Sequence, residues 1–188
     1  QTTASGSGFI DRVAREIERD QHQSSFKYWS RALAIIGVIV FLSHVAMFVL
    51  DYSEISRPLS VWLPRGVMMG LIFIVFYRAR DGALLPRSVA ERPVWSIWLG
   101  YLAALGAVNV LIATDLMHRS SMYTIGSVLS GFGFLATAGH AWGGTALFGV
   151  AFLVLSIFTA YYPPAAPLLY GSMWLITLLG LSRHYRDK

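Results

Sequence analysis

The sequence lacks cysteine entirely and is poor in charge. Without cysteine among its 188 residues, it has no disulfide, thiolate metal site or cysteine nucleophile. Charged residues make up 13% of the chain, whereas about 25% is usual for a soluble domain. Hydrophobic residues make up 55%, and the mean hydropathy is +0.56. This composition excludes an ordinary soluble domain and indicates a membrane protein.

The sequence also lacks the motifs of common enzymes. It contains no GxxxxGK[ST], HExxH, GxSxG or DFG segment. The terminal HYRDK follows an apolar run, with no room for the lobe that a kinase catalytic loop requires. We therefore expect no catalytic residue, no metal site and no resident cofactor in these residues. Nucleic acid is not an expected partner, because the basic residues separate apolar runs instead of forming one stripe.

Six apolar segments dominate the remainder, and each is near the roughly 20 residues that cross a bilayer as a helix. They are residues 29–50, 59–77, 94–113, 123–138, 143–161 and 166–181. The fourth is rich in glycine and serine, which predicts a kinked, re-entrant or tightly packed helix. The fold class is therefore all-α: a polytopic membrane protein with about six transmembrane helices arranged as three hairpins.

The distribution of basic residues predicts how these helices are oriented. Lys and Arg are retained in the cytoplasmic loops of membrane proteins. With both termini inside, 12 of the 15 basic residues are cytoplasmic, and only Arg57, Arg65 and Arg119 fall outside. Aromatic residues that favour headgroups agree, with Trp98 placed at the inner surface and Tyr123 at the outer. We expect a multi-pass membrane protein with both termini in the cytoplasm.

Four regions follow from this reading. Residues 1–8 form a Gly/Ser/Thr-rich linker, and residues 9–28 form an amphipathic juxtamembrane segment with a short helix. That helix either couples or dimerises the chain, or lies against the headgroups, and the second interpretation is favoured. Residues 29–182 form the six-helix domain, and residues 183–188 form a basic cytoplasmic tail.

Arg65 is the strongest charge within a predicted span. An ionisable residue inside a membrane is a candidate functional residue, and Asp51, Glu54 and Asp115 are its expected partners on the same side. The favoured alternative is that its long side chain reaches the outer headgroups. Pro64, which directly precedes it, loosens the helix at this point.

Two further polar residues lie within the spans. His44 is a weak candidate ligand for haem, together with His118, or for a chlorophyll-type pigment, but an interhelical hydrogen bond is the favoured role. Asn109 follows several small residues and is interpreted as a packing crosslink. The absence of Asp and Glu inside the six spans counts against an ion-coupled transporter.

Residues 142–187 resemble the C-terminal membrane domain of planctomycete-type bacterial serine/threonine protein kinases. The resemblance rests on a Gly-Gly helix, a proline-containing turn, an A-P-L-L-[FY]-G step, a tryptophan and a basic tail. These features correspond to Gly143, Gly144, Pro163, Pro164, Ala166 to Gly171 with Pro167, Trp174 and Arg183.

The resemblance implies a cytoplasmic kinase upstream and a membrane domain that anchors it, and that dimerises or regulates it. The expected partners are lipid and either a second copy or other membrane subunits. The alternative hypothesis is an accessory subunit of a photosynthetic or respiratory complex, in which case haem or pigment would bind near His44. A small transporter or channel is a weaker third hypothesis.

Overall fold

The computed structural model describes residues 29–52, 57–86 and 91–186, and every regular element among them is helical. The linker and the amphipathic juxtamembrane segment predicted for residues 1–28 lie outside the described residues. The long helices are α2 (Trp29–Tyr52), α3 (Arg57–Ala79), α4 (Glu91–Ala113), α5 (Ser121–Ala138), α6 (Thr145–Tyr161) and α7 (Ala166–Arg186). The short 3-10 helix η1 (Pro163–Ala165) joins α6 to α7.

The six predicted apolar segments coincide with these six helices. The largest difference is at the end of α7, which continues to Arg186, so most of the predicted basic tail is helical. The Gly/Ser-rich fourth segment forms a continuous helix of 18 residues. Among the described residues, α2, α3, α4 and α7 are long and apolar enough to cross a membrane, and α6 is a shorter apolar helix.

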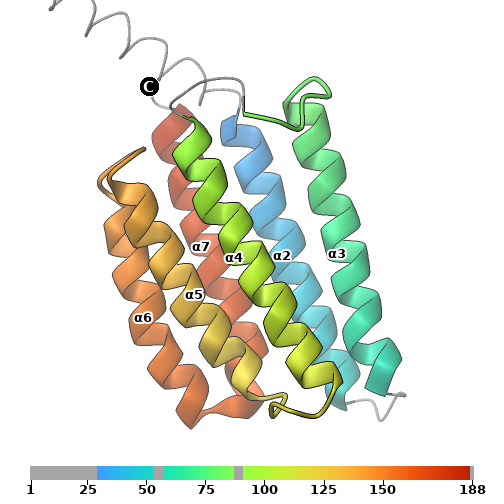
Figure 1. Cartoon of the computed structure of the whole chain (residues 1–188). Coiled ribbons are helices and arrows are strands. Elements are labelled where there is room, and N and C mark those ends of the chain that lie inside the picture. The colour runs from blue at the N-terminus through green and yellow to red at the C-terminus, as the bar shows by residue number, and fades with distance from the viewer. Residues whose placement is uncertain (1–28, 53–56, 87–90, 187–188) are drawn as a thin grey trace, which may run out of the picture.

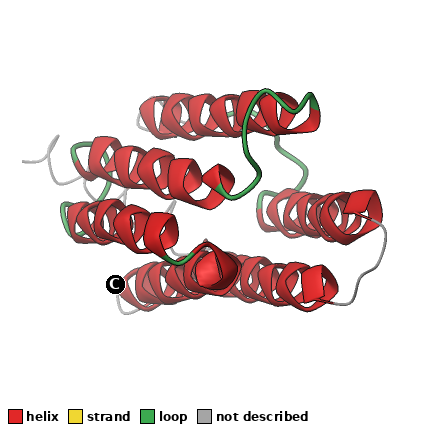
Figure 2. Ribbon diagram, turned by 90° about the horizontal axis from the view of Figure 1, so that it is seen from below, coloured by secondary structure: helices red, strands yellow, loops and turns green. Residues whose placement is uncertain are grey.

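The helices form an antiparallel bundle in which α2 begins and α7 ends at the same end (Figure 1). We call this the terminal end, and the opposite end the far end. The most extensive packing joins α2 to α7 and α5 to α6. In addition, α3 packs on α2 and α4 packs on α5. Viewed along the bundle, α3 stands to one side (Figure 2).

The surface of the bundle is apolar, while its interior contains hydroxyl groups. Leu42, Phe73 and Leu147 are more than half exposed, whereas Ser130 and Thr159 are fully buried. Helices apolar on all sides with small and polar residues at their contacts are typical of membrane bundles. Some buried hydroxyls donate within their own helix, as where Ser130 Oγ donates to the Gly126 carbonyl at 2.7 Å, whereas Ser127 Oγ and Thr177 Oγ1 have no hydrogen-bond partner among the residues that the structure describes.

The core is aromatic and bridges four helices. Phe134 of α5 and Phe152 of α6 stack with centroids 5.5 Å apart, and Trp174 of α7 packs on both. Trp98 of α4 meets Phe134 edge to face at 4.9 Å. Trp98, which the sequence places at the inner membrane surface, packs its partly buried ring against this core, and its depth in a membrane stays a prediction.

Glycines allow the two most extensive contacts. A Cβ atom on Gly149 would lie 2.9 Å from the Gly131 carbonyl oxygen, so α5 and α6 touch through backbone. A Cβ atom on Gly171 would lie 2.7 Å from Cβ of His44, so α7 meets α2 equally closely. Of the three alternatives for the fourth segment, the structure shows tight packing.

Candidate functional site

Arg65 lies at the far end of α3 and points into the bundle. Its guanidinium donates to Asn109 Oδ1 on α4 at 2.9 Å and to the sulfur of Met122 on α5. It also interacts with the Tyr123 hydroxyl. Asn109 is anchored in turn, because its Nδ2 donates to the Leu105 carbonyl at 2.8 Å. Arg65 therefore joins α3 to α4 and α5.

The partners predicted for Arg65 differ from those observed. Asp51 instead forms an ion pair with Arg119 at 3.2 Å. Asp115 is exposed in the α4–α5 connection with a positive φ of 56°, and Glu54 lies outside the described residues. The favoured alternative, an Arg65 side chain that extends to the headgroups, does not match this inward geometry. The partner of Arg65 is an amide and not the expected carboxylate, because Asn109 on α4 lies within hydrogen-bond distance of the Arg65 guanidinium on α3.

His44 is buried between α2 and α7. Its Nδ1 lies 2.7 Å from the Val40 carbonyl oxygen, and its ring packs on Tyr123 at 6.0 Å and on Tyr170 at 5.3 Å. The close approach of Gly171 fills the remaining side. The histidine is 5% exposed, so this packing leaves no room for a macrocycle beside it. The sequence favoured an interhelical hydrogen bond, whereas the bond to Val40 lies within α2, and His44 meets α5 and α7 through ring packing.

Three hydroxyl groups meet beneath His44, and the sequence analysis did not anticipate them. Tyr101 and Tyr170 approach oxygen to oxygen at 2.8 Å, and Ser130 lies 3.2 and 3.1 Å from these two oxygens. The cluster connects α4, α5 and α7. Because tyrosine is common at headgroup level, its sequence position alone does not separate an interface residue from a buried one. Tyr123 lies in the first turn of α5 at the far end, where its ring packs on His44.

Arg80 forms a second buried arginine site, at the terminal end. Its guanidinium pairs with Glu91 at 3.1 Å, and the two side chains are 4% and 11% exposed. It lies over the rings of Trp29, Phe76 and Trp95 at 5.2–5.7 Å. In the sequence, Arg80 is one of the 12 basic residues expected on the cytoplasmic side. The structure shows that it ties the α3–α4 connection to the beginning of α2.

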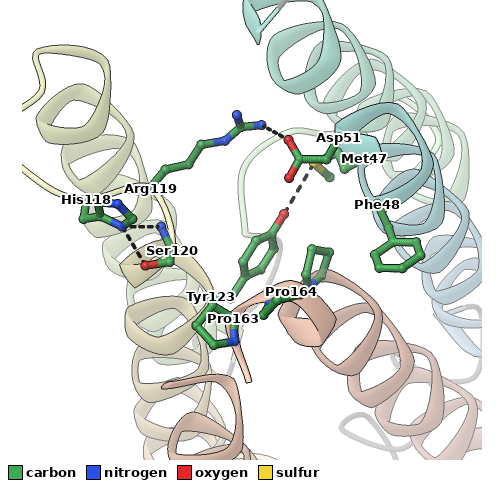
Figure 3. Close-up of a pocket in the computed structure, with 10 residues that line it drawn as sticks. Met47, Phe48, Asp51, His118, Arg119, Ser120, Tyr123, Pro163 and Pro164 are labelled. Atoms are coloured by element: carbon green, nitrogen blue, oxygen red, sulfur yellow. Dashed lines mark hydrogen bonds and ion pairs between the residues drawn. The ribbon is translucent and has the colours of Figure 1, made fainter. Parts of the chain in front are cut away.

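A pocket of about 360 Å³ opens at the far end. Its polar lining residues are Asp51, His118, Arg119, Ser120 and Tyr123, and its apolar lining residues are Met47, Phe48, Pro163, Pro164 and Pro167. Figure 3 shows Arg119 reaching from the α4–α5 connection to Asp51 on α2. His118 Nδ1 lies 2.7 Å from Ser120 Oγ. The pocket thus draws on three separate parts of the chain.

The residues on which the resemblance rests have structural roles. Gly143 and Gly144 precede α6 instead of lying within it, because α6 begins at Thr145. Pro163 and Pro164 form η1, and Pro167 lies in the first turn of α7, where a missing N–H is tolerated. Trp174 belongs to the aromatic core.

No group of three or more potential ligands from His, Cys, Asp and Glu gathers within the described part of the chain. Comparison with protein-family models, curated proteins and solved structures finds no match. The function is therefore argued from the geometry above.

Proposed function

We propose that the chain is a non-catalytic membrane domain that anchors a cytoplasmic serine/threonine protein kinase in the bacterial inner membrane. The observation that carries this proposal is that the bundle begins and ends at one end, and that this end is basic. Arg31, Arg78, Arg80, Arg92, Arg183 and Arg186 lie there, whereas Arg57, Arg65 and Arg119 lie at the far end. All six helices cross the bilayer in this proposal, with the terminal end in the cytoplasm.

The Arg80 site supports a regulatory link in addition to anchoring. Trp29 is the first residue of α2 and follows the predicted juxtamembrane segment directly. Through Arg80, Trp29 is joined to the α3–α4 connection. A structural change in the bundle would therefore be transmitted to the beginning of α2, the end of the bundle to which a kinase would be attached.

The orientation is tested by single-cysteine labelling, for which a cysteine-free chain is well suited. Leu116 lies in the far-end connection and His140 in a terminal-end connection, and both are exposed. With a membrane-impermeant maleimide applied to spheroplasts, L116C should react and H140C should react only after lysis. Labelling of H140C alone in spheroplasts would show that the orientation is opposite to the proposed one. Labelling of both variants would show that α5 does not cross the membrane.

The kinase partner is tested on protein from the native membrane. An antibody against this chain should precipitate a polypeptide well above 20.8 kDa. The precipitate should transfer phosphate from ATP to serine or threonine of casein, and should show no visible absorption band. A strain without the chain provides the control. A mass near 20.8 kDa with co-purified subunits or pigment would contradict the proposal and favour an accessory subunit.

A further inference from the structure

The far-end pocket has features of a binding site that the anchoring role does not require. Its volume of about 360 Å³ lies within the range of about 300–1,000 Å³ that is common for small-molecule sites. Its lining combines Met47, Phe48 and three prolines with polar and charged side chains. Figure 3 shows Asp51 beside Met47 and Phe48 on α2, with Arg119 and His118 across from them, so a molecule held here would meet polar and apolar groups together.

The charges around the pocket favour an anion. Tyr123 lies on its wall and interacts electrostatically with Arg65, Arg119 and Asp51. Arg119 and Asp51 line the pocket and balance each other, and Arg65, which lies behind Tyr123 and does not line the pocket, adds one positive charge to this group. Arg65 is bound by the neutral groups Asn109 and Met122, which do not cancel its charge.

The one carboxylate is placed so that a ligand can replace it. Asp51 and Arg119 form an ion pair at 3.2 Å, and their side chains remain 57% and 39% exposed. Pairs this exposed contribute little to stability. A carboxylate or phosphate that enters the pocket would take over Arg119 at little cost, and the hydroxyl groups of Ser120 and Tyr123 also line the pocket.

We propose that this pocket binds a small amphiphile whose head is a single carboxylate or phosphate group and whose body is apolar. The head exchanges with Asp51 on Arg119, and the body lies against Phe48 and the proline wall. The same head chemistry occurs in free fatty or aromatic acids and in anionic lipid headgroups.

Binding is tested on the full chain in nanodiscs of phosphatidylcholine by isothermal titration calorimetry. Hexanoate and hexyl phosphate are the anionic probes. Hexylammonium, a cation with a similar alkyl chain, is the control. The two anions should bind and hexylammonium should not. R119Q should weaken anion binding about tenfold or more, because a charge-assisted hydrogen bond is lost. R183Q, which changes an exposed arginine at the other end, is the matched control and should bind as the parent does.

D51N provides a readout that misfolding cannot imitate. Without the competing carboxylate, anion affinity should increase several-fold, whereas an unfolded variant only loses affinity. D115N changes an exposed aspartate that does not line the pocket, and should leave affinity unchanged.

The lipid source is distinguished by adding phosphatidylglycerol to the nanodiscs. If it competes with hexanoate and is retained by the parent chain but not by R119Q in native mass spectrometry, the headgroup is the ligand. If it does not compete, the ligand is a free solute. Failure of all three anions to bind, or binding that is equal in R119Q, would overturn the proposal. These outcomes are independent of the kinase assay.

Discussion

The contact between α5 and α6 makes Gly149 the position where one methyl group should do the most damage. A Cβ atom there would lie 2.7 Å from Leu135 Cγ, 2.9 Å from the Gly131 carbonyl oxygen and 3.0 Å from the Leu135 backbone nitrogen. The Leu135 side chain can rotate, but the two backbone atoms move only if α5 moves. Gly149→Ala must therefore separate the two helices.

The magnitude follows from two opposing contributions. Overpacking a well-packed core costs about 1–3 kcal/mol. Replacing glycine by alanine inside a helix contributes up to about 1 kcal/mol in the opposite direction. Gly106→Ala isolates the second contribution, because a Cβ atom on Gly106 has nothing within 4 Å. The difference between the two variants should therefore be about 1–3 kcal/mol, the packing cost alone.

The assay is reversible unfolding of the full chain in mixed micelles with increasing dodecyl sulfate, followed by circular dichroism. Gly149→Ala should unfold at lower detergent fraction than the parent, and Gly106→Ala at the same fraction or higher. Equal unfolding of the two variants would refute the reasoning, because it would mean that α5 and α6 do not touch through backbone.

Three other changes are expected to alter stability in the same assay. Arg65→Ala should lower the free energy of unfolding by about 1–3 kcal/mol, because it leaves the Asn109 amide without its partner. In a double-mutant cycle with Asn109→Leu, the two losses of stability should not add, since the two side chains bond to each other. Additive losses would mean that Arg65 extends to the headgroups instead. Glu91→Ala should cost about 3–5 kcal/mol by leaving a buried charge. Adding Arg80→Met should recover much of that loss, and an unrecovered double variant would show that the pair is not the cause. Gly171→Ala should cost about 1–3 kcal/mol by separating α7 from α2, and an unchanged midpoint would contradict that contact.

The helices were predictable, whereas most side-chain partners were not. Long apolar runs fix where a membrane helix lies, so even the Gly/Ser-rich segment was placed to within two residues of α5. The direction of a polar side chain depends on which helix lies beside it. Arg65 was recognised as unusual, but its amide partner required the relative placement of α3 and α4.

The two sites that the sequence analysis missed have ordinary residue signatures. Arg80 resembles any cation that flanks a membrane helix, and only its burial under three rings distinguishes it. Tyr101 and Tyr170 resemble headgroup tyrosines until α4 and α7 bring their hydroxyls together. The pocket likewise combines residues from α2, the α4–α5 connection and η1 that are far apart in sequence.

The helices differ in length around the bundle, and this has a consequence for the surrounding lipid. At about 1.5 Å per residue, the 24 residues of α2 extend about 36 Å, whereas the 17 residues of α6 extend about 26 Å. A bilayer that meets α6 on one side and α2 on the other encounters two hydrophobic thicknesses. In the proposed six-span arrangement, such mismatch costs a fraction of a kcal/mol per Å, so thinner membrane would be favoured beside α6 than beside α2.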